Sequence, residues 1–333
     1  MGTDTNVTPT SPPLPAAIFD RLLDLLVVPG YGSIGPRLRK AWWPPDPVPF
    51  TRPTDVVVTG GSSGLGAAAA AGLAALGARV HLVGRDADRL GTAAAKIRLK
   101  VRDAEVVHHE SDISDLDAAR ALVDAIGSQV DALHGLVHCA GIMPAQRTTT
   151  AQGHELALAT HVLGPFLVTA GLRTLLQADG DARVVWVSSG GMYTQPLPSD
   201  DLEYTRGQYK GATAYARTKR MQVVLAEELA AAFTAPDDPV VHSMHPGWAA
   251  TPGVSGSLPA FEKITRPILR SPEQGADTIV WLAASPEAAV STGQFWHDRR
   301  VRPTHYLPWQ RDDPAARQKL WDTCVADTGV TLG

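Results

Sequence analysis

From Thr54 onward, short apolar runs alternate with longer segments that have the 3.6-residue period of a helix. The runs are rich in Val, Ile and Leu and cover residues 55–59, 78–83, 104–109, 133–138, 183–188 and 239–245, with a seventh near 294–297. This alternation is typical of parallel strands joined by crossover helices that cover both faces of a sheet. We therefore predict an α/β fold, a doubly wound parallel sheet of about seven strands in a single domain.

Composition narrows the class of protein. An apolar content of 44% and a charged content of 19% are those of a globular chain, and a net charge of -4 argues against non-specific nucleic-acid binding. The two cysteines, Cys139 and Cys324, form no CxxC pair, and the run His108-His109-Glu110 lacks the spacing of metal ligands. We expect no metal, no secretory signal, no membrane-spanning segment and a cytoplasmic setting.

The alternation divides the chain into an extension over residues 1–50, an α/β domain over residues 51–300 and a tail over residues 301–333. The Pro- and Thr-rich start, to about residue 16, is expected to be flexible, and Ile18–Val28 to form an amphipathic helix. The predicted apolar face consists of Ile18, Phe19, Leu22, Leu25 and Leu26.

This extension has two possible roles. It could pack on its own domain or on a subunit partner, which would also cover Trp42 and Trp43, or it could contact a membrane surface. The helix carries Asp20, Arg21 and Asp24, and this mixed charge favours packing over a membrane contact.

A glycine-rich loop follows the first predicted strand and leads into an Ala-rich helix. Glycines let the backbone turn tightly and approach a pyrophosphate, and the N–H groups at a helix start favour negative charge. The predicted dinucleotide-binding residues of this loop are Thr59, Gly60, Ser62, Ser63, Gly64, Leu65 and Gly66.

The end of the second strand bears on the choice of cofactor. An NAD site usually has an acidic residue there, whereas this sequence has Gly84 followed by Arg85. Arg85 therefore favours NADP(H) over NAD(H), although it could instead be a solvated surface charge paired with Asp86.

Three polar residues suggest proton transfer. Ser189 follows a buried strand, and Tyr215 and Lys219 stand four residues apart on one face of a predicted helix. A free tyrosine has a pKa near 10, and a nearby ammonium group is expected to lower that pKa, which would suit the tyrosine as an acid and base for a carbonyl. The serine hydroxyl would orient the carbonyl oxygen.

Between about Thr54 and Arg300 these motifs resemble the short-chain dehydrogenases/reductases, and in particular the retinol-dehydrogenase-like branch that includes family member twelve. TGGSSGLG (59–66) is similar to the family's TGxxxGxG, HCAG (138–141) stands in place of NNAG, and YARTK (215–219) is similar to YxxxK. VSSGG (187–191) would carry the active serine, and HPGWAAT (245–251) resembles the family's PG segment. The resemblance implies a Rossmann-type fold, a nicotinamide cofactor and a homodimer or homotetramer built through the helices that carry His161 and Tyr215.

The resemblance also implies site residues. Further cofactor-binding positions would be Asp112, Ile113, Cys139, Ala140, Gly141, Tyr215, Lys219, Pro246, Gly247, Trp248 and Thr251. The substrate would contact Met143, Gly191, Tyr193 and Trp248, of which Tyr193 and Trp248 could instead fill loop cores.

The sequence departs from the family at two places. His161 stands where the family has a catalytic asparagine, and it could relay protons to Lys219 or be a buried structural histidine. His138 and Cys139 replace paired asparagines, which removes a side-chain bond between strands.

The leading hypothesis is an NADP(H)-dependent oxidoreductase that interconverts a carbonyl and an alcohol on a mostly apolar small molecule by hydride transfer. Its catalytic set would be Ser189, Tyr215, Lys219 and His161. The alternative is a nucleotide-binding sensor or interaction protein that keeps the fold without catalysis.

Overall fold

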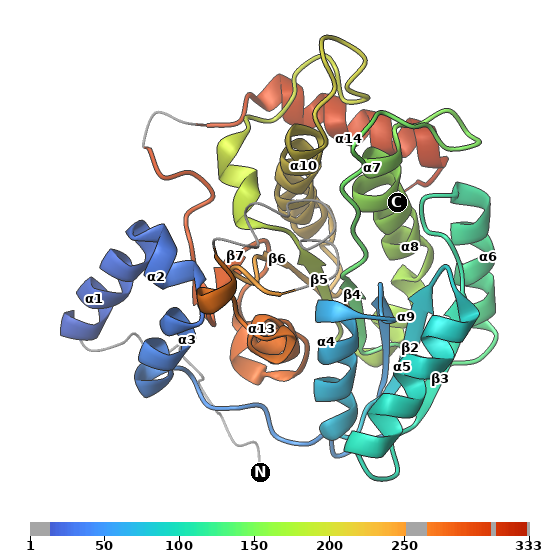
Figure 1. The fold of residues 1–333 in the computed structure, drawn as a ribbon. Coiled ribbons are helices and arrows are strands. Elements are labelled where there is room, and N and C mark those ends of the chain that lie inside the picture. Colours follow the sequence, from blue (N-terminus) through green and yellow to red (C-terminus); the bar gives the residue numbers. More distant parts are fainter. Residues whose placement is uncertain (1–13, 251–264, 308–310, 332–333) are drawn as a thin grey trace.

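The chain folds around one eight-stranded sheet, seen in a computed structural model that describes residues 14–250, 265–307 and 311–331. The strand order is β3-β2-β1-β4-β5-β6-β7-β8, and every neighbouring pair is parallel except β7 and β8 (Figure 1). The strands are β1 (Asp55–Thr59), β2 (Arg79–Gly84), β3 (Val106–Glu110), β4 (Gly135–His138), β5 (Arg183–Val187), β6 (Val240–Met244), β7 (Phe295–His297) and β8 (Arg300–Val301). The predicted doubly wound α/β fold is confirmed, and its seven strands are all present.

The eighth strand is a difference from the prediction. β8 has only two residues, too few for a periodic pattern, and it follows β7 through a two-residue turn. Both turn residues, Asp298 and Arg299, have positive φ (51° and 54°), a conformation that such a turn requires but that usually calls for Gly or Asn. The sequence therefore lacks the usual signal for this hairpin.

Helices cover both faces of the sheet and bury two apolar layers. Val57 of β1 faces the layer that contains α6, α8 and α10, while Val56 and Val58 face the layer with α4, α5 and α13. This division follows from the two-residue period of a strand. The helices are α4 (Gly64–Ala75), α5 (Ala87–Lys100), α6 (Leu116–Gly127), α7 (Leu156–Leu158), α8 (Gly164–Gly171), α9 (Arg173–Asp179), α10 (Gly211–Ala232), α13 (Pro272–Ala284) and α14 (Pro314–Thr328). Among the described residues no single helix is long and apolar enough to span a membrane, although Leu156–Gly171 and Arg173–Asp179, bent by 55°, together reach that length and composition.

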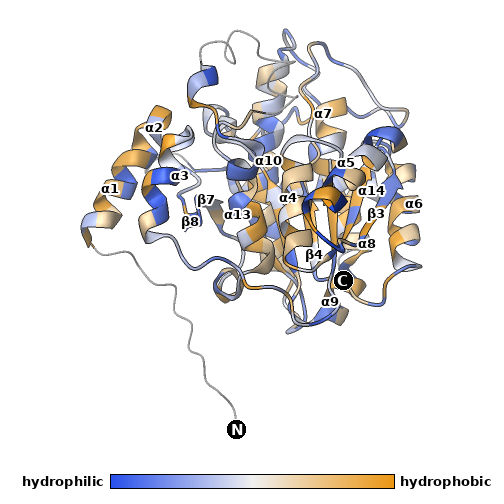
Figure 2. Cartoon of the chain, turned by 60° about the horizontal axis from the view of Figure 1, so that its bottom comes forward, coloured by the Kyte–Doolittle hydropathy of each residue, from blue (hydrophilic) through white to orange (hydrophobic). Residues whose placement is uncertain are grey.

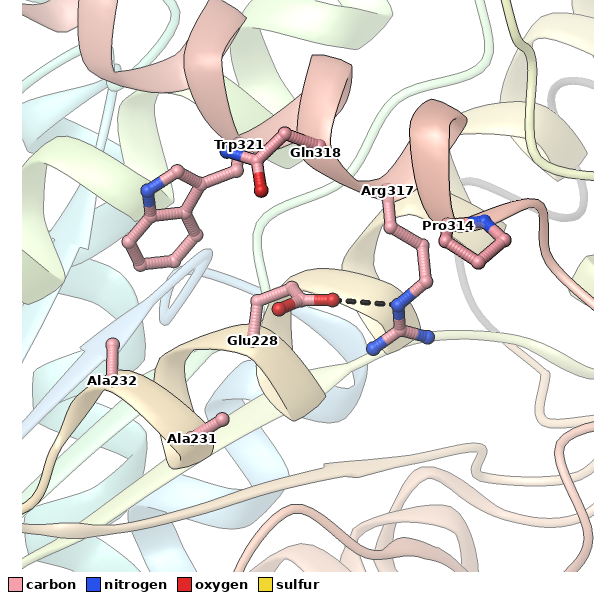
Figure 3. A pocket seen from close by; sticks show the side chains of 7 residues that line it. All are labelled: Glu228, Ala231, Ala232, Pro314, Arg317, Gln318 and Trp321. Atoms are coloured by element: carbon pink, nitrogen blue, oxygen red, sulfur yellow. Dashed lines mark hydrogen bonds and ion pairs between the residues drawn. The ribbon is translucent and has the colours of Figure 1, made fainter.

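The C-terminal helix α14 packs across α8 and α10 (Figure 1). The rings of Trp321 and Phe166 meet edge to face with centroids 5.5 Å apart, and Leu320 is fully buried. Figure 3 shows the seam between α10 and α14, where the Arg317 guanidinium donates to Glu228 at 2.6 Å. A homo-oligomer is expected through the helices that carry His161 and Tyr215; α10 carries Tyr215, and α8 directly follows the turn that carries His161. That oligomer stays a prediction, and α14 occupies part of the face it would use.

The N-terminal extension forms four short elements: α1 (Leu14–Leu25), α2 (Val27–Tyr31), α3 (Ile34–Arg39) and a 3-10 turn over Lys40–Trp42. The helix expected over 18–28 thus begins earlier and is interrupted at Leu26, and most of the start expected to be flexible, residues 1–13, lies outside the described residues.

The extension packs on its own domain, one of the two kinds of packing expected for it, but it does not do so through the predicted apolar face of α1. The predicted face is exposed, whereas Asp20 and Asp24 are buried. Asp20 accepts hydrogen bonds from Arg39 at 2.7 Å and from Arg302 at 2.7 Å, so α1 is held to the domain by its acidic side. Ion-pair partners this far apart in the sequence are not visible in the hydrophobic pattern.

Buried histidines make the fold sensitive to acid. Burial lowers the pKa of His138 to about 3, of His297 to about 3 and of His242 to about 4. An unfolded histidine binds its proton near pH 6.5, so the unfolded chain binds more protons than the native one as the pH falls below that value. The stability these groups contribute is complete above about pH 6.5 and is lost toward pH 4.

We expect the unfolding free energy, measured by urea denaturation, to fall between pH 7 and pH 4, with each buried histidine contributing about 1.4 kcal/mol per pH unit. His138→Gln is expected to reduce this slope, whatever its effect on stability at pH 7. The exposed His108 provides the control, since His108→Gln should keep the wild-type slope. Equal slopes in His138→Gln and the wild type would contradict the prediction.

Candidate active site

A cavity of about 1000 Å³ lies at the carboxyl ends of the central strands. Its walls come from the loops that follow β1 to β6, at the place where the order of a doubly wound sheet reverses and ligands bind. The predicted site residues that line it are Gly60, Ser62, Ser63, Gly64, Leu65, Gly66, Arg85, Asp112, Ile113, Cys139, Ala140, Gly141, Met143, Ser189, Gly191, Tyr215, Lys219, Pro246, Gly247 and Trp248.

Three predicted site residues do not line the cavity. Thr59 is buried, and its hydroxyl accepts hydrogen bonds from the backbone N–H groups of Cys139 and Ala140 at 3.1 and 3.2 Å. The Tyr193 hydroxyl instead donates to the Pro303 carbonyl at 2.7 Å, and its ring packs against that of Tyr306, so both contacts are with the C-terminal tail. His161 lies behind the cavity wall, and Thr251 lies outside the described residues.

The loop after β1 has the compact backbone that close approach to a diphosphate requires. Gly60 has a φ of +68°, and a Cβ there would lie 2.8 Å from Cα of Ala140. A Cβ on Gly66 would lie 2.4 Å from the Gly60 carbonyl oxygen, so only glycine fits at either position. The backbone N–H groups at the start of α4 face this loop, as in known anion sites at helix N-termini.

Two arginines line the far end of the cavity. Arg85 lies 3.7 Å from the Asp112 carboxylate and is more than half exposed, and Arg89 donates to the Ser63 hydroxyl at 3.4 Å. The sequence analysis missed Arg89, although Asp86 caps α5 and thereby places Arg89 in its first turn, near Arg85. No acidic side chain stands at Gly84, and this end of the cavity is lined by the guanidinium groups of Arg85 and Arg89 and by the carboxylates of Asp86 and Asp112.

The predicted proton-transfer residues meet at the other end of the cavity. The hydroxyls of Tyr215 and Ser189 are hydrogen-bonded to each other, and the Lys219 ammonium lies 5.4 Å from the centroid of the Tyr215 ring. Burial raises the pKa of Tyr215, and the bond to Ser189 only partly opposes this. The pKa of Tyr215 therefore lies above its usual value here, because the cost of burying a phenolate is the largest effect, and a lowering of that pKa by Lys219 stays a prediction.

Lys219 is held in place from the side away from the tyrosine. Its ammonium donates to the Val187 carbonyl at 2.8 Å and to Oε1 of Gln222 at 2.9 Å. Burial lowers the pKa of Lys219 to about 8, so the side chain still carries its charge at neutral pH. Its positive charge beside Tyr215 favours loss of the phenolic proton during a reaction.

His161 is fully buried in a π-helical turn over Ala159–Leu163, and both ring nitrogens are hydrogen-bonded. Nε2 accepts from the backbone N–H of Ile142 at 3.0 Å, so Nδ1 carries the proton and donates to Thr218 at 2.7 Å. Burial, with the nearby Lys219 charge, lowers the pKa of His161 well below its usual value and keeps the ring neutral. These contacts agree with the structural interpretation of this histidine.

A residue that the sequence analysis missed connects this turn to the lysine. The Gln222 amide donates to the His161 carbonyl at 2.9 Å while its oxygen accepts from Lys219. Gln222 stands three residues after Lys219, one turn further along α10, so its position on the same helix face could have been noticed.

The expectation of no metal stays a prediction. One group of possible ligands in the described part of the chain, His154, Glu203 and Asp327, brings its ligand atoms within 4.8 Å of one another. His154 and Glu203 are already paired at 2.9 Å, and this group does not line the cavity.

The fold and the cavity together define a dinucleotide-binding α/β protein with acid–base groups at one end of its crevice. A sequence model described as short chain dehydrogenase matches residues 54–200. Dehydrogenase/reductase SDR family member 12 of Bos taurus is 41% identical over 269 residues, which cover 79% of this chain and 83% of that protein. Retinol dehydrogenase 14 of Homo sapiens is 30% identical over 335 residues, which cover 95% of this chain and 98% of that protein. The chain belongs to the short-chain dehydrogenase/reductase family, within the branch that contains these two relatives.

A solved structure supports the same assignment. The Pseudomonas aeruginosa RhlG/NADP active-site complex is 25% identical, with a TM-score of 0.59, and the match covers 73% of this chain and 93% of that one. Membership of the family identifies the chain as an oxidoreductase with a nicotinamide cofactor.

Proposed function

We propose that this chain is an NADP(H)-dependent oxidoreductase that interconverts a carbonyl and an alcohol on a mostly apolar small molecule. The observation that carries the proposal is that Ser189, Tyr215 and Lys219 share one cavity with a glycine loop suited to a diphosphate. The side chains of Met143, Trp248 and Leu269 in the same cavity favour an apolar substrate.

Each polar group has a distinct role in this proposal. Tyr215 gives a proton to the carbonyl oxygen during reduction and takes it back during oxidation. Ser189, hydrogen-bonded to Tyr215, holds the same oxygen in place. Lys219 supplies the positive charge that stabilises the phenolate, and Gln222 keeps its ammonium in position.

The residues at the other end fit the cofactor. The glycine loop and the start of α4 would hold the diphosphate, and Arg85 and Arg89 would hold the 2′-phosphate of NADP(H). When bound, the nicotinamide supplies or accepts the hydride. The name of the RhlG/NADP complex agrees with this choice of cofactor.

The proposal is tested by following nicotinamide absorbance while the purified protein reacts with NADPH, or separately NADH, and a panel of aldehydes, ketones and quinones. Turnover with NADPH is the expected result. Cofactor binding without turnover on any of these compounds would instead favour the non-catalytic alternative.

The cofactor preference gives a separate prediction. Arg85→Ala and Arg89→Ala are each expected to raise the dissociation constant for NADPH by about 10- to 100-fold, because each removes a charge-assisted hydrogen bond to the phosphate. The affinity for NADH should change much less. Fluorescence titration measures both constants, and Arg102→Ala, at an exposed arginine that does not line the cavity, is the matched control. Equal losses for NADPH and NADH would contradict the 2′-phosphate role.

A further inference from the structure

The N-terminal extension presents an apolar patch on its outer surface. The patch comprises six residues of α1, of α2 and of the single residue between them, each more than half exposed: Leu14, Ile18, Leu22, Leu25, Leu26 and Val28. Elsewhere in the described part of the chain only two large aliphatic residues, Val48 and Leu99, are exposed to this extent. Figure 2 shows these hydrophobic segments on helices at one edge of the molecule.

The polar residues of α1 hold the patch in this orientation. Surface helices of globular proteins bury their apolar side, whereas α1 buries Asp20 and Asp24 together with one leucine, Leu23. Arg302 donates to both oxygens of Asp20, at 2.7 and 3.0 Å, and Arg39 donates to the same carboxylate. Buried ion pairs add little net stability but require one geometry, so they fix which side of α1 faces outward.

The same burial decides the charge that the extension shows to its surroundings. With both aspartates paired inside, the exposed charged residues between Leu14 and Trp43 are Arg21, Arg37 and Lys40, all basic. Arg21 lies within the patch, one turn from Ile18 and Leu25, and the Phe19 ring contacts Trp42, which brings the turn that contains Lys40 against α1. Over residues 14–43 the mixed charge seen in the sequence thus becomes an apolar surface flanked by positive charge, and the next acidic residue, the exposed Asp46, is paired with Arg299.

We propose that this patch docks on the surface of a lipid bilayer that contains anionic lipids. An apolar helix face that enters the interface, with lysine and arginine beside it, is the pattern by which amphipathic helices lie on membranes. Each basic side chain close to an anionic surface adds to the attraction. The proposal concerns a contact with the bilayer surface, so it does not depend on the proposed catalytic function.

The extension is also joined to the wall of the cavity. The Tyr31 carbonyl accepts from the Trp248 backbone N–H at 2.8 Å and from Arg270 at 2.8 Å, and the Tyr31 and Trp248 rings lie 6.1 Å apart. Trp248 lines the cavity. The extension that carries the patch is therefore in direct contact with a wall of the cavity.

The test is flotation of the full chain with vesicles of phosphatidylcholine alone and with vesicles that also contain phosphatidylserine. Stronger binding to the anionic vesicles, weakened by salt, is expected. The variant Leu22→Gln with Leu26→Gln should weaken binding to both kinds of vesicle by at least about tenfold. Arg21→Gln, Arg37→Gln and Lys40→Gln together should weaken binding to anionic vesicles by on the order of a hundredfold at low salt.

Matched controls separate the patch from general effects. Leu99→Gln removes a leucine on α5 that is even more exposed than Leu22 and Leu26, and Lys96→Gln, Arg102→Gln and Lys319→Gln together remove three exposed charges elsewhere. Both controls should bind as the wild type does. Because every substituted residue is exposed, the variants should fold. If the double variant does not fold, Leu22→Gln alone tests the same contact.

Three results would overturn the proposal. The wild type could fail to bind anionic vesicles, or the patch variants could bind as strongly as the controls. The third result would come from analytical ultracentrifugation without vesicles. If the wild type is a dimer and the variant that combines Leu22→Gln with Leu26→Gln is a monomer, the patch binds a second copy of this chain instead.

Discussion

Replacing Tyr215 with phenylalanine is expected to reduce turnover of a carbonyl substrate by about 100-fold or more while leaving the dissociation constant for NADPH nearly unchanged. The substitution removes the one hydroxyl that is bonded to Ser189 and close to Lys219, and it keeps the ring that forms part of the cavity wall. Lys219 stays bound to Val187 and Gln222, so its position should not change. Turnover and NADPH affinity are measured on the same preparations.

A second tyrosine provides the control for this substitution. Tyr204 does not line the cavity, and its hydroxyl donates a hydrogen bond to the nearby Gln208 carbonyl at 3.2 Å. Tyr204→Phe should therefore retain wild-type turnover. Full activity in Tyr215→Phe would exclude Tyr215 as the proton donor, whereas a loss of NADPH affinity equal to the loss of turnover would assign it to cofactor binding.

Asp298→Asn is expected to lower the free energy of unfolding by about 3–5 kcal/mol. The Asp298 carboxylate is buried and accepts from Arg39 at 2.6 Å and from Arg270 at 2.6 and 3.0 Å. The variant keeps the size and the positive φ that asparagine tolerates, but it leaves two buried guanidinium groups short of negative charge. Urea denaturation followed by circular dichroism measures the difference.

The pH dependence of this difference identifies its cause. The neighbouring charges hold the pKa of Asp298 far below its usual range, so the stability from this carboxylate is complete above about pH 4 and is lost as the pH falls through the lower native pKa. Asp103→Asn is the matched control, because Asp103 also has positive φ but is exposed. A loss below about 1 kcal/mol in Asp298→Asn, or an equal loss in Asp103→Asn, would contradict the role of buried charge.

Local patterns were enough to predict the sheet and most of the cavity. The parallel strands are short apolar runs, and the glycine loop, Ser189, Tyr215 and Lys219 follow strands or share a helix face. These signals lie within a few residues of one another, and the order of a doubly wound sheet then brings them together.

What the sequence did not predict depends on contacts between distant residues. The outward apolar face of α1 follows from Arg302, which is 282 residues from Asp20. The pKa of the Tyr215 phenol depends on how deeply the tertiary structure buries it. Burial raises this pKa, whereas the short spacing to Lys219 in the sequence suggests only a lowering. His161 could not be assigned from its position, because both candidate roles need a histidine that can donate and accept. Its contacts with Ile142 and Thr218 occupy both ring nitrogens, and its role in proton relay stays a prediction.

The position of α14 has a consequence for how the protein responds to dilution. Where an apolar helix face is covered by another subunit, the stability of that face depends on protein concentration. Here Leu320 and Trp321 of the same chain cover part of the surface of α8 and α10, so this burial is intramolecular. That share of the folding free energy is independent of concentration, and the helix that carries Tyr215 and Lys219 keeps this cover even at the lowest concentrations used in an assay.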